Sequence, residues 1–234
     1  MRSWSIVMLL VLTAAATAAA APAKSEANRV GDAARVIREL RAAPDDAIPE
    51  SIWDRARCVI VMPGVKKAAF IVGGEFGKGV VSCRTTRGWS TPVFLTLEKG
   101  SVGAQIGAES TDIVLLVMNE HGIERLLQDK VTLGADASLA AGPVGRSGAA
   151  ATDAQLTAEM LSYSRARGLF AGFDLSGGVL RPDNDASRDF YGHAVVNREV
   201  LLGGVREPIP VAANPFIAAL SGAPRSAANR PTAN

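Results

Sequence analysis

The sequence predicts an α+β fold: a curved antiparallel sheet, forming a sandwich or partial barrel, with short helices packed outside. Apolar residues alternate with polar residues or glycine through 102–109 and 131–139, the period of two that half-buried strands require. Gly103, Gly107 and Gly134 lie within these stretches, and repeated strand glycines suit the bends and bulges of a curved sheet. Because no helical pattern alternates with each strand, a parallel βαβ architecture is not expected.

The first 23 residues have the features of a secretory signal peptide. Arg2 precedes an apolar run at 6–12, and an alanine-rich tract to Ala23 offers small-residue cleavage sites. The apolar run is too short to span a bilayer as a stable anchor. We therefore expect a periplasmic or secreted protein whose mature chain has no transmembrane anchor.

Residues 24–220 are expected to form a single domain, and residues 221–234, rich in Pro, Ala, Ser and Asn, a disordered tail. Without Arg2, the mature chain carries 24 of the 25 basic residues against 23 acidic ones. Nucleic-acid binding normally needs a clearly basic domain, so we expect no nucleic-acid partner. Any site for anions must come from local patches.

Helical spacing of Val30, Ile37 and Leu40 predicts a helix over 25–43 that ends at Pro44. A second short helix is expected to start at Pro49. Further short helices are predicted at 120–128, 183–191, 198–202 and 215–220.

Strands are predicted at 58–62, 68–73 and 79–84, because Pro63-Gly64 and Gly73-Gly74 between them are turn signals. The continuous apolar run 113–118 is expected to be a strand buried on both faces. Other strands are predicted at 92–97, from Val102, from Val131, and in two segments separated at Gly168, with a flexible loop at 142–152.

The two cysteines, Cys58 and Cys83, each border an apolar run, and their number is even in a chain expected to be exported. We hypothesise a disulfide between them, worth roughly 3 kcal/mol in the chain-entropy model. Two buried free thiols, or one reactive thiol, are the alternatives. Titration of thiols in the denatured, unreduced protein separates these cases.

The sequence contains no recognisable apparatus for catalysis, metal binding or a cofactor. Neither His121 nor His193 has metal-ligand spacing with another His or Cys, and no nucleophile elbow or phosphate-binding loop is present. Carboxylates on different strands can still converge, so a hydrolase acting on envelope components is kept as an alternative. Its candidate acids are Glu109, Asp112, Asp136 and Asp174.

Several blocks of the chain, in one order, are similar to the SYLF-domain family. They include residues 77–82, 88–90, 103–112, 131–135, 141–146, 162–172 and 190–192, within a resemblance that covers about 52–220. The resemblance implies a lipid-binding module, with phosphoinositides as ligands of eukaryotic members and actin as a partner of fungal ones. The leader indicates an exported member of bacterial type, for which actin and ordinary phosphoinositides are not expected.

Two basic groups are candidates for contact with anionic lipid. One gathers around the predicted turns, and the other lies on the first helix among apolar residues, a composition suited to an anionic interface. The alternatives are an ordinary solvated face and a helix that packs on the sheet. The candidate residues are Lys66, Lys67, Lys78, Arg84 and Arg87 in the first group and Arg29, Arg35 and Arg38 in the second.

Glycines at Gly73, Gly74, Gly77 and Gly79 fit either a hairpin turn or a cradle for an anion. The sequence thus predicts an exported, non-catalytic module that recognises anionic lipid head groups at a membrane surface. A structural or protein-interaction module of the envelope is the remaining alternative.

Overall fold

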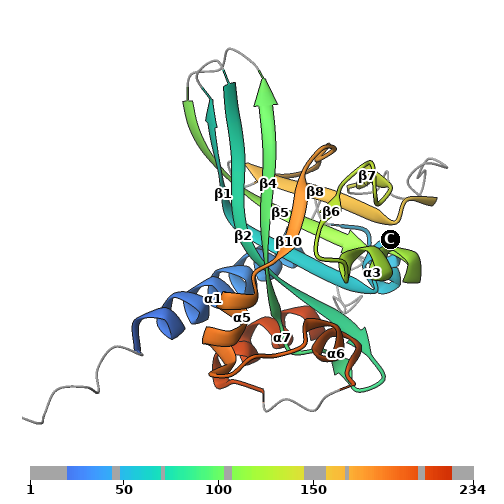
Figure 1. Ribbon diagram of the computed structural model, residues 1–234. Helices are drawn as coiled ribbons and strands as arrows, with labels where there is room; N and C mark the ends of the chain where they lie inside the picture. Colours follow the sequence, from blue (N-terminus) through green and yellow to red (C-terminus); the bar gives the residue numbers. More distant parts are fainter. Residues whose placement is uncertain are drawn as a thin grey trace, which may run out of the picture.

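A curled sheet forms the centre of the molecule, with helices on both of its faces (Figure 1). The structure is a computed structural model that describes residues 20–43, 48–69, 72–102, 107–144, 157–166, 169–204 and 209–222. The strands within these ranges are β1 Cys58–Ala69, β2 Val72–Thr85, β3 Gly88–Trp89, β4 Val93–Val102, β5 Gly107–Val117, β6 Val131–Thr132, β7 Leu139–Ala141, β8 Met160–Ala166, β9 Leu169–Gly172 and β10 Val179–Pro182.

The strands follow the order β6-β10-β4-β2-β1-β5-β8-β7, with β3 beside β2 and β9 beside β8. All of these pairings are antiparallel except the pairing of β7 with β8. The predicted α+β class with a curved sheet is therefore confirmed, and the parallel β7–β8 pair is the one departure from antiparallel order in the described sheet.

The predicted helices are present with ends shifted by a few residues. They are α1 Ala20–Ala42, α2 Glu50–Arg55, α3 Glu120–Leu126, α5 Asn184–Tyr191, α6 Asn197–Leu202 and α7 Asn214–Ser221, and the 3₁₀ turn η2 Val211–Ala213, which was not predicted, precedes α7. Side chains cap two of them: Asn119 accepts a bond from the Gly122 N–H, and Asp183 accepts one from the Ala186 N–H. None of the described helices combines the length and hydropathy needed to cross a bilayer.

The prediction of turns at Pro63-Gly64 and Gly73-Gly74 was wrong, because both pairs lie inside long strands. In β1 the register against β2 and β5 shifts by one residue around Gly64, which marks a β-bulge. Gly64 has φ +60° and its N–H donates to Asp112 Oδ1 at 2.9 Å. Glycine is the residue that takes this left-handed conformation without strain, so a turn-like signal in the sequence serves a bulge here.

The prediction of one long strand from Val131 to Leu139 was also wrong. The chain turns instead between β6 and β7, where Gly134 has φ +82° and the Asp136 N–H donates to the Thr132 carbonyl at 2.8 Å. The Asp136 carboxylate closes the same turn by accepting the Thr132 N–H at 2.7 Å. Alternating small residues do not fix a strand when a turn competes for the same backbone groups.

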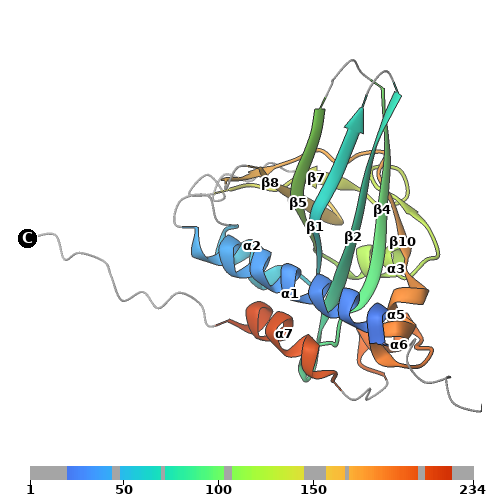
Figure 2. The same cartoon turned by 90° about the vertical axis from the view of Figure 1, so that its left-hand side faces the viewer.

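Two hydrophobic cores lie on the two faces of the sheet. Helices α1, α2, α5 and α7 cover one face with a core that includes Ile37, Phe94 and Phe216, and Figure 2 shows α1 and α7 side by side there. Helices α3 and α6 contribute to the core on the other face. Of the run 113–118 that was predicted to be buried, Ile113 to Val117 are buried, because their side chains enter both cores in turn, and Met118 is half-buried.

The predicted disulfide between Cys58 and Cys83 is confirmed, and it joins directly opposite residues of β1 and β2. Both cysteines are buried in the core on the α6 side of the sheet. The bond therefore links the two ends of the longest hairpin in the described sheet, at the end where the strands are enclosed by helices.

At the other end, strands β1, β2, β4 and β5 project beyond the helices (Figures 1 and 2). We refer to their outer residues, 65–69, 72–78, 98–102 and 107–111, as the arm. The pairing of β10 with β4 reaches only Glu98, and the pairing of β8 with β5 reaches only Asp112. The arm is therefore a four-stranded sheet, and a groove lies where it meets α1.

Candidate functional site

The groove between the first half of α1 and the base of the arm is the candidate site. It has a volume of about 370 Å³ and is open to solvent. Helix α1 forms one wall, and strands β1 and β2 form the other. The lining residues are Ser25, Asn28, Arg29, Asp32, Pro63, Gly64, Lys66, Phe76, Gly77 and Lys78. Three of the eight predicted basic residues, Arg29, Lys66 and Lys78, thus meet in one concavity.

Strand register places two lysines and an aromatic ring on the same face of the arm. Lys66 of β1 lies directly opposite Phe76 of β2, and Lys78 follows Phe76 by two residues along that strand. Residues two apart on a strand point to the same face, so the three side chains form one cluster. The Phe76 side chain is 47% exposed and the Lys78 side chain is 50% exposed. An aromatic ring and two ammonium groups are therefore available at the mouth of the groove.

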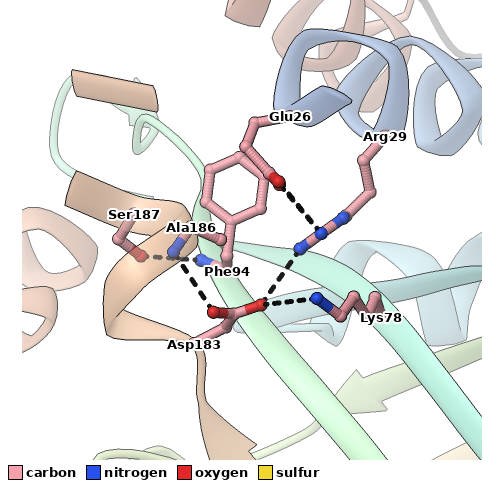
Figure 3. Close-up of polar contacts among 7 residues, drawn as sticks. All are labelled: Glu26, Arg29, Lys78, Phe94, Asp183, Ala186 and Ser187. Atoms are coloured by element: carbon pink, nitrogen blue, oxygen red, sulfur yellow. Dashed lines mark hydrogen bonds and ion pairs between the residues drawn. The ribbon is translucent and has the colours of Figure 1, made fainter. Parts of the chain in front are cut away.

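Arg29, in contrast, is held in a partly buried network of charges beside the groove (Figure 3). Its guanidinium lies 2.9 Å from Glu26 and 3.3 Å from Asp183, and it stacks over the Phe94 ring at 5.2 Å from the centroid. Asp183 also faces the Lys78 ammonium, at 3.9 Å. The network joins α1, β2 and the start of α5, and its four charged groups sum to zero.

Burial in this network raises the pKa of Glu26 above its ordinary value, and the nearby Asp183 charge raises that pKa further. The positive charges of Arg29 and Lys78 act in the opposite direction on the Glu26 pKa but do not cancel the effect of burial. The carboxyl group of Glu26 is therefore the acid of the network that takes up a proton more readily than an exposed glutamate does.

The neighbouring Lys67 does not join the groove. It lies opposite Glu75, on the other face of the arm, and pairs with that buried carboxylate at 3.5 Å. A separate hollow of about 140 Å³ on this face is lined by both residues and by Phe173, with Val65, Thr111, Ile113 and Ser164. Lys66 and Lys67, assigned to one candidate basic group from the sequence, therefore point to opposite faces of the arm.

Arg84 and Arg87 lie near the other end of β2, away from the groove. The Arg84 guanidinium donates to the carbonyls of Ala56 at 3.0 Å and Trp53 at 3.3 Å and stacks over Trp89, and burial lowers its pKa. Arg87 donates to the Gly203 carbonyl at 2.7 Å. These two arginines tie local structure together and are not brought into the candidate site.

On α1, Arg35 lies one turn beyond the groove and pairs with Asp32 at 3.6 Å and with Glu39 at 3.4 Å. Arg38 is exposed and stands outside the residues that line the groove. The apolar stripe of α1 is buried against the sheet and α7. Packing on the sheet, the interpretation favoured for this helix from its sequence, therefore describes α1 from Val30 to Leu40.

The glycines of β2 do not form a turn, because they lie inside the strand, and at Gly77 and Gly79 the lack of a side chain permits close packing. A Cβ on Gly77 would lie 2.7 Å from Val65 Cγ2, and one on Gly79 would lie 2.8 Å from Met62 Sδ and still closer to the Val61 carbonyl oxygen. Real Cβ atoms do not approach so closely. The bulge of β1 thus fits against a strand that is stripped of side chains at these positions.

The candidate acids of a hydrolase site serve local structure where their side chains are described. Asp112 accepts the Gly64 N–H and lies 3.7 Å from Arg165, which in turn pairs with Glu39 of α1. Asp136 and Asp174 close turns by accepting backbone N–H groups. The bond from the Thr132 N–H lowers the pKa of Asp136, and bonds from the Ser176 hydroxyl and N–H lower the pKa of Asp174. The side chain of Glu109 lies outside the described residues.

Sequence reasoning missed Phe76, Glu26 and Asp183 as parts of the site. Phe76 could have been found as the only large apolar residue between Gly73 and Gly79, two positions before a candidate lysine. Asp183 carries no comparable signal, because it is more than one hundred residues away from Lys78 and reads as a helix cap. Within the described residues, no group of three or more His, Cys, Asp or Glu side chains is arranged to hold a metal ion.

Comparison with known proteins places this chain in a family. The family Ysc84, described as "Las17-binding protein actin regulator", matches residues 98–223, more than half of the chain. The SH3 domain-containing protein PJ696.02 of Schizosaccharomyces pombe is 34% identical over 204 residues, which are 85% of this chain and 47% of that protein.

Two further relatives come from yeast and human. Protein YSC84 of Saccharomyces cerevisiae is 32% identical over 83% of this chain and 42% of its own length. The SH3 domain-containing YSC84-like protein 1 of Homo sapiens is 31% identical over 79% of this chain and 55% of its own length. The chain therefore spans about half of the length of these relatives. Because the family match covers more than half of the chain and the relatives are more than 30% identical over more than two thirds of it, the chain belongs to the Ysc84 family, the SYLF-domain family that its sequence blocks resemble.

Proposed function

We propose that the chain is an exported, non-catalytic module that binds the anionic head group of a lipid in the groove between α1 and the arm. The observation that carries the proposal is the exposed Phe76 ring placed beside the Lys66 and Lys78 ammonium groups. Ammonium groups attract a lipid phosphate, and an aromatic ring suits the boundary between head group and acyl chain. The groove is open enough to admit a head group that remains attached to a bilayer.

Electrostatics limits the strength of this site. Lys66 is the groove cation that faces no fixed carboxylate in the described network, whereas Lys78 is shared with Asp183. About 1 kcal/mol per lysine near a charged surface is the usual gain. Two lysines would then strengthen binding roughly thirtyfold over a neutral surface. Screening by salt should weaken the attraction strongly, since both ammonium groups are exposed.

Sedimentation with vesicles tests the proposal. Purified protein is mixed with vesicles of phosphatidylcholine alone or with added phosphatidylglycerol, at low and at high salt. We expect preference for the anionic vesicles at low salt, and loss of that preference, roughly thirtyfold in affinity, when Lys66→Gln and Lys78→Gln are combined.

The matched control combines Arg38→Gln with Lys130→Gln, which removes the same charge from exposed positions outside the groove. This control should lose little affinity. Equal losses of affinity in the two double variants would show that the attraction depends on the net charge of the protein and not on the groove. Absence of any anionic preference at either salt concentration would reject lipid head groups as the ligand.

A protein partner is the second candidate, because the matched family is described as Las17-binding and actin-regulating. Those words describe the family, and the named relatives are about twice as long as the matched region. The proposed export separates this chain from cytosolic actin, so lipid is placed first. Co-sedimentation with actin filaments, in parallel with the vesicle assay, distinguishes the two candidates.

A further inference from the structure

The Asp183 carboxylate contacts the two cations that border the proposed head-group site, Arg29 and Lys78, from the interior side of the groove. Its Oδ2 lies 3.3 Å from the Arg29 guanidinium and 3.9 Å from the Lys78 ammonium (Figure 3). Its other oxygen accepts the Ala186 N–H at 3.2 Å. A carboxylate in this position makes the contacts with these cations that a phosphate oxygen of a bound ligand would make.

We propose that Asp183 is an internal competitor that weakens anion binding in the groove and so sets its affinity. The inference rests on the proposed function, since it names the residue that regulates the same site. It differs from a simple packing role because it predicts that removal of one acidic charge strengthens binding.

The competitor is fixed in place, whereas the cation that it shares is free to move. The Asp183 N–H donates to the Phe94 carbonyl at 2.9 Å, and the Phe94 N–H donates to Ser187 Oγ at 3.2 Å, so the start of α5 is pinned to β4. Lys78 makes the longest contact of the network and its side chain is 50% exposed. An anion in the groove would therefore draw Lys78 away from Asp183, while Arg29 stays with Glu26 and Asp183.

The size of the effect follows from Coulomb's law. An anion on Lys78 would lie roughly 7 Å from the Asp183 carboxylate, partly in solvent. At an effective dielectric constant of about 40 to 80, one unit charge at that separation changes the affinity for a monoanion about threefold to tenfold. A phosphomonoester carries close to two charges, so its affinity should change by about the square of that factor.

The test is Asp183→Asn, which removes the charge and retains the cap, because an asparagine side-chain oxygen also accepts a helix N–H. Asp185→Asn is the matched control: it lies in the first turn of the same helix, has a side chain that is 82% exposed, and pairs with Arg188 instead of a groove cation. Both variants change the net charge equally. Binding is measured on phosphatidylcholine vesicles that carry either phosphatidylglycerol or phosphatidic acid.

We expect Asp183→Asn to bind phosphatidylglycerol vesicles about threefold to tenfold more tightly than the wild-type protein, with a larger gain for phosphatidic acid. For Asp185→Asn, the affinity for either kind of vesicle should rise only by the small amount that follows from the change in net charge. Glu26→Gln, which removes the other carboxylate on Arg29 from a different element, should also strengthen binding. Far-UV circular dichroism and melting temperature confirm that each variant is folded.

The outcomes separate this inference from the proposed function. If the wild-type protein binds anionic vesicles and Asp183→Asn gains no more than Asp185→Asn, the competitor is refuted and the lipid site stands. If neither the wild-type protein nor Asp183→Asn binds, both ideas fail together. Binding by Asp183→Asn alone supports both, because it identifies a site that the internal carboxylate had closed.

Discussion

Removal of the Cys58–Cys83 disulfide should cost the protein a large part of its stability. The bond joins residues separated by 25 positions, at the enclosed end of the β1–β2 hairpin. In the chain-entropy model, opening a loop of this length increases the conformational entropy of the unfolded chain, which lowers the free energy of unfolding by about 3.5 kcal/mol. For folded chains of roughly 150 to 250 residues, a loss of this size lowers the melting temperature by about 7 to 14 °C.

Urea unfolding, followed by circular dichroism, compares the oxidised protein, the reduced protein and a variant that combines Cys58→Ala with Cys83→Ala. The reduced protein isolates the cross-link, whereas the variant adds the loss of two sulfur atoms that are buried in the core. We expect the order oxidised, reduced, double alanine from most to least stable. A difference of less than about 1 kcal/mol between the oxidised and reduced forms would refute the loop-closure reasoning.

Three further substitutions test other parts of the fold. Asp112→Ala removes the acceptor of the Gly64 N–H and should destabilise by about 1 to 3 kcal/mol in urea unfolding, whereas Asp112→Asn, which keeps an acceptor oxygen, should cost less. Gly79→Ala should destabilise by more than the usual effect of a surface alanine, because its Cβ would meet the Val61 carbonyl; a melting temperature equal to wild type contradicts the close-packing argument. Burial raises the pKa of Glu26 above 4.5, so the stability that this group contributes is full below pH 4.5 and falls as the pH rises through the raised pKa. Chemical denaturation across a pH series measures this dependence. In Glu26→Gln this part of the pH dependence should be absent.

Periodic sequence patterns correctly predicted the elements whose apolar residues can only be buried. The apolar face of α1 and the run through β5 are examples, since a stripe or a continuous apolar stretch has to be buried. Short signals were less reliable. Pro63-Gly64 is compatible with a turn or a bulge, and the long cross-strand pairing of β1 with two neighbours selected the bulge.

The site was only partly predictable for a similar reason. Basic residues could be recognised in the sequence, but their partners are set by tertiary contacts between α1, β2 and α5. Lys78 and Arg29 come together through Asp183, which is remote from both in the sequence. Arg84 resembles them in composition and is nevertheless held by backbone carbonyls near α2.

The bulge at Gly64 changes which residues of β1 point to each face of the sheet. Before it, odd-numbered residues such as Val59 and Val61 face α1; after it, even-numbered residues do, so Lys66 meets the groove and Lys67 does not. One inserted residue therefore assigns two adjacent, chemically identical side chains to separate environments. A deletion of one residue at the bulge would exchange their faces while leaving the composition of the arm unchanged. Position relative to the bulge, more than the number of lysines, decides what this surface can attract.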